Sequence, residues 1–248
     1  MARILAFIAV AGLLASPATA VEPAPTPNKN FTRWAAGTIA YRVKSTGVVN
    51  GYETWRLSVH PDGSRTMAAT VQYAPRDIQR HVVQRVDGAF KPLEAYALYW
   101  IDGQWRGSAT VNASNKKLNI NASTPSGVQT QSFEIGDTLA IVPHVLATDS
   151  WRAMIYDKAK GGTQPIPAYN FNATGEGPMG LLGKVMSYKL TYVGAENVSV
   201  PAGTFATDHY RVEDAVDLFI TGPDGVLVKF IYSSIDREHH LIGYRSGP

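Results

Sequence analysis

Short strand-like segments separated by turn residues recur along most of this chain, and this rhythm constrains the fold more than any other feature. Residues 38–45 alternate, with Ile39, Tyr41 and Val43 on one face and charged residues between them. This is the period-two pattern of a half-buried strand. The pattern returns about every ten residues as far as residue 134, with Gly, Pro, Asn or Asp in the linkers. Such short linkers favour antiparallel hairpins over βαβ units.

The last quarter of the chain continues the rhythm. A turn at residues 201–203 precedes an expected strand at 204–212, and the turn at 222–225 joins expected strands at 215–221 and 226–233. Curling or closing a sheet of this kind removes its exposed edges. The sequence therefore predicts a mainly all-β fold, an antiparallel meander curled into a barrel or half-barrel.

Two segments depart from the alternation. Residues 135–160 are apolar but irregular and contain Pro143, which predicts one short helical or irregular plug packed against the sheet. Residues 175–183 are rich in glycine. They are interpreted either as a mobile flap that closes with Met179 and its leucine neighbours or as an ordinary long connection.

The N-terminal region has the pattern of an export signal. Residues 1–20 combine a basic start, a short apolar run and small residues at the expected cleavage point, which is typical of a signal peptide. The apolar run is too short to span a bilayer, so no stable membrane insertion is expected. Residues 21–30 are rich in proline and predict a tether, and residues 31–248 predict a single β-barrel or half-barrel domain. The expected location is periplasmic or secreted.

Composition removes several classes of function. The chain has no cysteine, which excludes disulfides, thiolate catalysis and Cys-based metal sites. After residue 20, 22 basic and 20 acidic residues leave a net charge of +2. No basic run with interleaved aromatic residues is present, so we expect no nucleic-acid partner.

Metal and cofactor motifs are also weak. The six histidines are scattered and no HExxH occurs, so no metal is expected. Gly175, Gly177 and Gly180 satisfy the spacing of a dinucleotide-binding loop, but Pro178 and Gly183 disrupt the helix that such a loop requires. We expect no cofactor.

Aromatic residues are the candidates for ligand binding. Tyr96 and Trp100 share one face of an expected strand, Trp105 begins the next strand, and Trp151 lies in the plug segment. Large side chains with a polar group suit the wall of a ligand pocket. The alternative is that these four residues only fill the core of the barrel.

His144 is the candidate for proton transfer, because it lies in an irregular and otherwise apolar segment. If the protein is an enzyme, Tyr99 or Arg85 would be its partner. The alternative is a neutral histidine buried for structural reasons. No G-x-S-x-G motif for a nucleophilic serine is present.

The C-terminal stretch carries a resemblance. Residues 198–205, read with the strand that follows and with residues 227–230, resemble the end of a bacterial periplasmic domain of unknown function that is similar to Lol-type lipoprotein carriers and VioE-like proteins. The resemblance implies an antiparallel sheet curled into an incomplete barrel around a hydrophobic cavity. It implies no catalytic residues, because the resembling stretch contains none.

These observations give two functional hypotheses. In the first, an exported soluble protein binds a hydrophobic or aromatic small molecule or a lipid in a barrel cavity. In the second, a cofactor-independent enzyme of the lyase, isomerase or hydrolase type acts on an apolar small molecule in the same cavity. A purely structural role in the cell envelope is a third possibility, and the protein partner is unknown.

Overall fold

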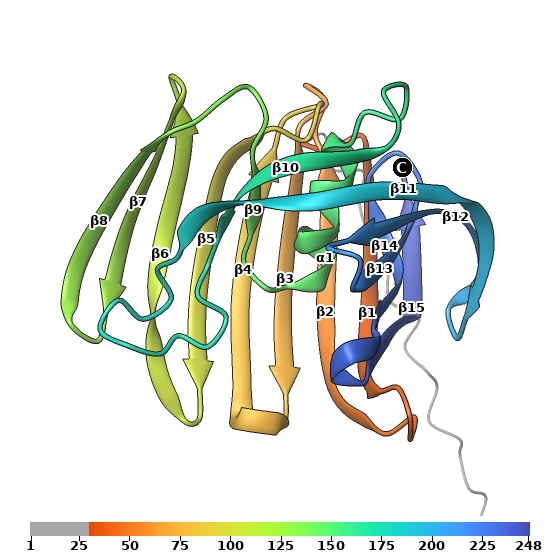
Figure 1. Cartoon of the computed structure of the whole chain (residues 1–248), viewed down its shortest axis with the longest axis horizontal. Helices are drawn as coiled ribbons and strands as arrows, with labels where there is room; N and C mark the ends of the chain where they lie inside the picture. Colours follow the sequence, from red (N-terminus) through yellow and green to blue (C-terminus); the bar gives the residue numbers. More distant parts are fainter. Residues whose placement is uncertain (1–29) are drawn as a thin grey trace, which may run out of the picture.

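The computed structural model describes residues 30–248, and these residues contribute fifteen strands to one sheet. Neighbouring strands pair in the order β8-β7-β6-β5-β4-β3-β2-β1-β15-β14-β13-β12-β11-β10-β9. All pairs are antiparallel except β9 and β10, which run parallel. The sheet curls so that its β10 and β11 end passes in front of the strands from the first half of the chain (Figure 1). The predicted antiparallel half-barrel is confirmed.

The sheet consists of two meanders that meet at the middle strands. In the first meander each strand pairs with the one before it: β1 (Arg33–Val43), β2 (Val49–Val59), β3 (Arg65–Tyr73), β4 (Ile78–Val86), β5 (Pro92–Ile101), β6 (Gln104–Ser114), β7 (Lys117–Thr124) and β8 (Gly127–Glu134).

The second meander starts at the opposite edge of the sheet and returns to the middle: β9 (Ala140–Val142), β10 (Thr163–Asn170), β11 (Lys184–Val200), β12 (Gly203–Val212), β13 (Val216–Thr221), β14 (Val226–Tyr232) and β15 (Arg237–Gly247). Strand β15 then pairs with β1 from Trp34 opposite Gly247 to Val43 opposite Arg237.

Alternation within each strand sets the inner and outer faces of the sheet. In β2 the buried residues include Glu53, Trp55 and Leu57, whereas Thr54 and Arg56 between them are exposed. This is the period-two pattern expected of a strand with one buried face. The inner faces together form the hydrophobic core.

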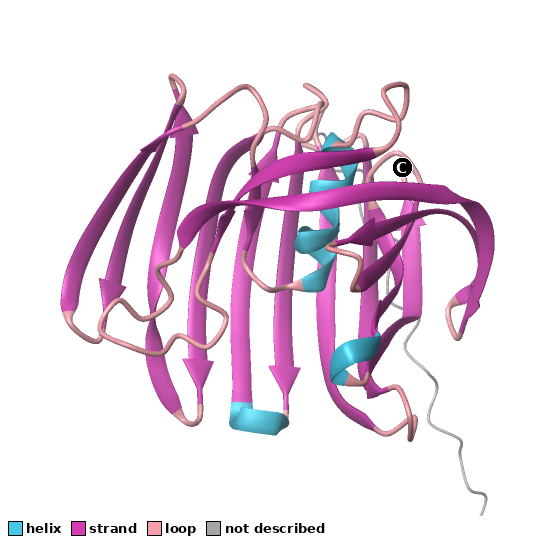
Figure 2. Cartoon of the chain, in the orientation of Figure 1, coloured by secondary structure: helices cyan, strands magenta, loops and turns pink. Residues whose placement is uncertain are grey.

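A short helical plug lies inside the curl, between the wall formed by β2 to β4 and the crossing strands β10 and β11 (Figures 1 and 2). It consists of helix α1 (Leu146–Asp149) followed by the 3₁₀ helix η2 (Ser150–Ile155). All four residues of α1 are buried. Trp151 packs edge-on against Phe90, and its indole N–H donates to the Asp224 carbonyl at 3.0 Å. The predicted plug around residues 135–160 is confirmed.

Within residues 30–248, β8 and β9 are the edge strands of the sheet, and side chains close the seam near them. The Tyr169 hydroxyl on β10 donates to Gln131 Oε1 on β8 at 2.8 Å. Gln131 Nε2 donates to the Gly183 carbonyl at 3.2 Å, and the Gly183 N–H donates back to the Tyr169 hydroxyl at 3.0 Å. A Cβ at Gly183 would overlap the Asn170 carbonyl, so this end of the glycine-rich segment must be glycine.

The described residues contain no helix that is long and apolar enough to cross a membrane. The predicted signal peptide at residues 1–20 and all but the last residue of the predicted tether lie outside the described residues.

Candidate functional site

A cavity of about 360 Å³ lies inside the curled sheet, between the plug and strands β12 to β15. Its apolar lining comes from the plug, from strands β9 and β12 to β14 and from the segments that follow β10, β12 and β14: Val142, Leu146, Ala173, Val212, Ala215, Val216, Phe230 and Ile235. Tyrosine, histidine, arginine and aspartate side chains complete the wall. Its volume falls in the range of roughly 300–1,000 Å³ that small-molecule sites occupy.

Glu53 on β2 attaches the plug to the wall of the sheet. Its buried carboxylate accepts hydrogen bonds from the Tyr41 hydroxyl at 2.6 Å and from the N–H groups of Leu146 at 2.8 Å and Ala147 at 2.7 Å. The first N–H groups of a helix have no partner within that helix, and here the carboxylate supplies one. Burial raises the pKa of Glu53 to about 7, although the three donors lower it. Glu53 thus fixes one wall of the cavity.

Arg80 on β4, two strands away in the same wall, supports the same region. It is 8% exposed and donates to the carbonyls of His144 at 2.8 Å and Ala173 at 2.6 Å. Its guanidinium also lies over the ring of Tyr99, 5.1 Å from the ring centroid, which is a favourable arrangement for a cation. Arg80 therefore holds the two backbone segments that border the cavity.

Asp149 and Arg152 project from the plug into the cavity with part of their hydrogen-bonding capacity unused. Among the described residues, Asp149 Oδ1 and Arg152 Nε are buried and have no partner, and the same holds for Arg80 Nε. The Arg152 guanidinium lies 4.9 Å from the centroid of the Tyr188 ring. Burial raises the pKa of Asp149 to about 6, although Arg152 and Arg80 lower it. Native proteins rarely leave such groups unpaired.

His239 on β15 is held between two rings, with Tyr41 at 4.4 Å and Phe230 at 5.2 Å between centroids. The Arg42 backbone N–H donates to His239 Nδ1 at 3.0 Å. Because that backbone group can only donate, Nδ1 is the acceptor and the proton of the neutral ring is on Nε2. Burial lowers the pKa of His239 to about 3, so the ring stays neutral and offers Nε2–H as a donor.

His144, predicted as the proton-transfer residue, does line the cavity. It adopts a left-handed backbone conformation with φ of 55°. Its Nε2–H donates to the Phe171 carbonyl at 2.8 Å, and burial lowers its pKa to about 4. His144 is therefore a neutral ring with Nε2 already engaged.

Of the two predicted partners of His144, Tyr99 reaches the residue beside it, whereas Arg85 lies elsewhere. Tyr99 is fully buried, and its hydroxyl donates to the Pro143 carbonyl. Arg85 lies on the outer face of β4, 3.7 Å from Asp62 and 3.4 Å from Glu94. The outward position follows from the strand period, since Val82 and Val86 on the same strand point inward. The arginine that faces inward near Tyr99 is Arg80.

The four predicted ligand-binding aromatics also lie away from the cavity. Tyr96 and Trp100 point outward from β5 and are 40% and 42% exposed. Trp105 is half-buried and pairs with Trp100 across β5 and β6. Trp151 is buried in the plug at the turn that contains Gly225. None of the four is among the residues that line the interior cavity, and Tyr96 and Trp100 point outward because the inward face of β5 carries Ala95, Ala97 and Tyr99.

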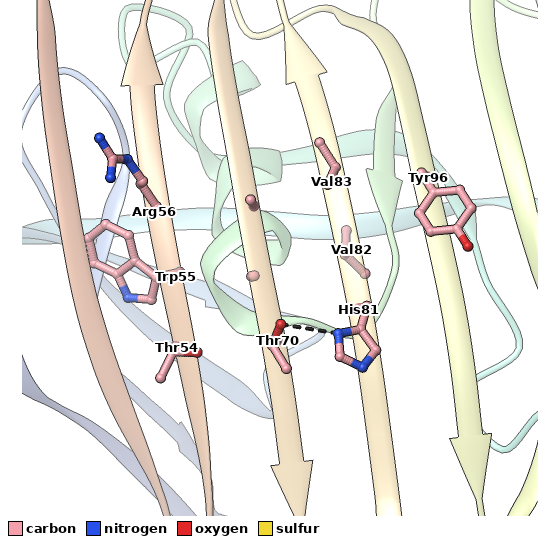
Figure 3. Close-up of a pocket in the computed structure, with 10 residues that line it drawn as sticks. Thr54, Trp55, Arg56, Thr70, His81, Val82, Val83 and Tyr96 are labelled. Atoms are coloured by element: carbon pink, nitrogen blue, oxygen red, sulfur yellow. Dashed lines mark hydrogen bonds between the residues drawn. The ribbon is translucent and has the colours of Figure 1, made fainter.

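The outer face of the sheet has a shallow depression of about 450 Å³. Figure 3 shows Thr54, Arg56, Thr70, His81, Val83 and Tyr96 on this face of β2 to β5. His81 Nδ1 lies 3.2 Å from the Thr70 hydroxyl. These outward side chains are exposed or half-exposed, so none of the six offers a buried polar group to orient a ligand. The interior cavity is the better candidate site.

Sequence reasoning missed most of the polar residues of the interior cavity. Arg80 shares the inward parity of Val82, and Glu53 shares that of Trp55. A charged residue at an inward position was the available signal. Asp149 and Arg152 flank Trp151 in the plug, but nothing in the sequence indicates that they face the same space.

The chain matches no family model and no curated protein sequence. Among solved structures it is similar to a β-barrel-like protein of the domain of unknown function DUF1849 from Brucella abortus, with a TM-score of 0.52 and 8% identity over 87% of this chain and 98% of that one. It is also similar to a DUF1089 family protein from Pseudomonas aeruginosa, with a TM-score of 0.41 and 13% identity over 74% of this chain and 90% of that one. At these identities the first likeness supports the fold, a β-barrel-like curled sheet, and nothing finer.

Proposed function

We propose that this protein binds one small hydrophobic or aromatic molecule in the cavity inside its curled sheet. The observation that carries the proposal is the cavity itself: about 360 Å³, lined by apolar side chains together with buried polar groups of Arg80, Asp149 and Arg152. Apolar pockets with a small number of fixed polar groups are typical of small-molecule sites. The volume suits a single compact molecule or acyl chain better than a complete membrane lipid.

The proposed setting is the bacterial periplasm or the medium outside the cell. The signal-like sequence of residues 1–20 supports export. The resemblance of the C-terminal stretch to Lol-type carriers and VioE-like proteins supports a carrier with an incomplete barrel, and the arrangement of an interior plug within an open sheet agrees with that form. Membership of that group is part of the proposal.

Binding accounts for the site better than catalysis by the residues first considered. The hydroxyl proton of Tyr99 is committed to the Pro143 carbonyl, and Nε2 of His144 is committed to Phe171. Arg85 is on the opposite face of the sheet. A proton-transfer group must reach the substrate within hydrogen-bonding distance, and these three side chains do not converge on one point.

The direct test is native mass spectrometry of the protein purified from its natural source, followed by solvent extraction and identification of the bound molecule. A stoichiometric hydrophobic molecule is the expected result. A protein that is empty and also fails to bind uncharged aromatic and aliphatic probes would contradict the proposal.

A pair of variants locates the site. Val216 lines the cavity and Val83 is exposed on the outer face, and both lie on strands. Val216→Trp should fill the cavity and weaken binding of an uncharged probe, N-phenyl-1-naphthylamine, by tenfold or more. Val83→Trp should leave binding unchanged. Fluorescence titration measures the affinity of each variant for the probe. Equal affinities for the two variants would show that the probe does not bind in this cavity.

A further inference from the structure

Arg152 is a buried cation that no described residue neutralises through a hydrogen bond. The residue is 7% exposed, and its Nε is buried without a partner. The Tyr188 ring lies 4.9 Å from the guanidinium, and the Asp149 carboxylate acts on it through charge without a hydrogen bond. A guanidinium has five N–H donors arranged to match a planar anion. Burying it without acceptors is costly unless an acceptor arrives from elsewhere.

The charges that line the cavity favour an anion with a single negative charge. The residues that line the cavity include three arginines, Arg80, Arg152 and Arg237, and two acidic residues, Asp149 and Glu213. His144 and His239 add no charge, because burial lowers the pKa of each, to about 4 and about 3 respectively. The lining therefore has an excess of one positive charge.

Two other residues in the lining of this cavity carry N–H donors for an acid. His239 is fixed as the tautomer with its proton on Nε2, since Nδ1 accepts from Arg42. Arg80 Nε is a further buried donor without a partner in the described part of the chain. Apolar residues such as Val216 and Phe230 line the same cavity, so apolar surface and N–H donors share one space.

We propose that the ligand of this cavity is a carboxylic acid with an apolar body, bound with its carboxylate on the Arg152 guanidinium and its body against Val216 and Phe230. This inference rests on the proposed function, that the cavity binds a small hydrophobic molecule. Planar, two-point pairing with arginine is the strongest recognition that a carboxylate finds in proteins. Asp149 beside Arg152 limits the excess charge and so disfavours a second negative charge on the ligand.

The test compares three probes that share a ten-carbon chain and differ in their head group: decanoate, decan-1-ol and decylamine. Isothermal titration calorimetry of the purified protein at pH 7.5, below the concentrations at which the probes aggregate, gives the three dissociation constants. Decanoate should bind at least tenfold more tightly than decan-1-ol, which corresponds to about 1.4 kcal/mol. Decylamine should bind most weakly.

Charge variants separate recognition of the acid from damage to the fold. Arg152→Gln should remove most of the preference for decanoate and leave the affinity for decan-1-ol nearly unchanged. Asp149→Asn removes the opposing charge, so it should strengthen decanoate binding severalfold. Arg85→Gln, on the outer face, is the matched arginine control and should change neither affinity.

The outcomes distinguish the two proposals. Equal binding of decanoate and decan-1-ol, or tightest binding of decylamine, would overturn the carboxylate inference and leave the binding cavity standing. Absence of binding for all three probes would overturn both. An Arg152→Gln protein that binds the alcohol but keeps the full preference for the acid would assign the carboxylate to another group and overturn the role of Arg152.

Discussion

Buried ionisable side chains give this protein its most distinctive residue-scale property. Glu53, Asp149, Arg80 and Arg152 are all less than 10% exposed, in positions where a β-barrel interior ordinarily carries apolar residues. Glu53 is the best satisfied of the four, with three donors on its carboxylate. If it is protonated, the Tyr41 contact can reverse, with the carboxyl donating and the phenol accepting. The contact survives in both charge states.

The raised pKa of Glu53 predicts a loss of stability as pH rises. Its folded pKa of about 7 exceeds the ordinary value of 4.5, so the folded state binds the proton more tightly. That contribution is complete below pH 4.5 and is lost as pH rises through 7. Relative to Glu53→Gln, the wild type should lose about 3 kcal/mol of unfolding free energy between pH 4.5 and pH 8. Urea unfolding at the two pH values measures this difference.

The control for this prediction is Glu94→Gln, which changes an exposed glutamate on the outer face. Its stability should follow that of the wild type at both pH values. A constant difference between wild type and Glu53→Gln from pH 4.5 to pH 8 would show that the Glu53 carboxylate titrates as in the unfolded chain.

At the scale of single elements, the sequence predicted most strands and the inward face of β1, with Ile39 and Tyr41, correctly. Most strands of the first meander and the last hairpins were expected close to their observed bounds, because alternation and turn residues are local signals. The face of β5 was expected the wrong way round. Tyr99, which packs against Phe171 and bonds to the Pro143 carbonyl, already fills the space behind β5, so small Ala95 and Ala97 point inward and the larger Tyr96 points outward.

The turn between β13 and β14 offers an element-scale test of plug packing. Gly222 and Gly225 both have φ of +69°, but only Gly225 faces the plug: a Cβ there would lie 2.8 Å from Met154 Cγ and 3.0 Å from Trp151 Cδ1. Gly222→Ala should cost about 1 kcal/mol for the backbone conformation alone. Gly225→Ala should cost roughly 1–3 kcal/mol more because of overpacking. Thermal and urea unfolding measure the stability of each variant. Equal losses of stability for Gly222→Ala and Gly225→Ala would show that the plug is loosely packed against this turn.

For the molecule as a whole, contacts between residues far apart in the chain decide the shape, and the sequence alone did not predict these contacts. Nothing local indicates that β15 pairs with β1 or that Gln131 meets Tyr169 across the seam. The same limit applies to the candidate site, because Arg80, Arg152 and His239 come from three distant segments. The sequence predicted that the sheet would curl, because curling removes exposed edges. It did not predict which strands would meet at the seam.

The seam gives a prediction at this scale. Tyr169→Phe removes the hydroxyl that donates to Gln131 and accepts from the Gly183 N–H. It should lower the unfolding free energy by about 1–3 kcal/mol and speed amide hydrogen exchange selectively in β8 and around residue 183. Tyr96→Phe on the outer face is the matched control and should change neither. Exchange that rises equally in all strands would argue against a local seam.

The pairing of β1 with β15 also bears on the order in which the protein folds. Strands β2 to β7 find their partners among immediate neighbours in the chain, whereas Trp34 must meet Gly247, roughly 200 residues further along. Closing so long a loop costs more entropy and slows folding. In pulsed hydrogen exchange during refolding, amides of β4 and β5 should gain protection before those of β15. The first meander would then serve as the template on which the returning half of the chain assembles.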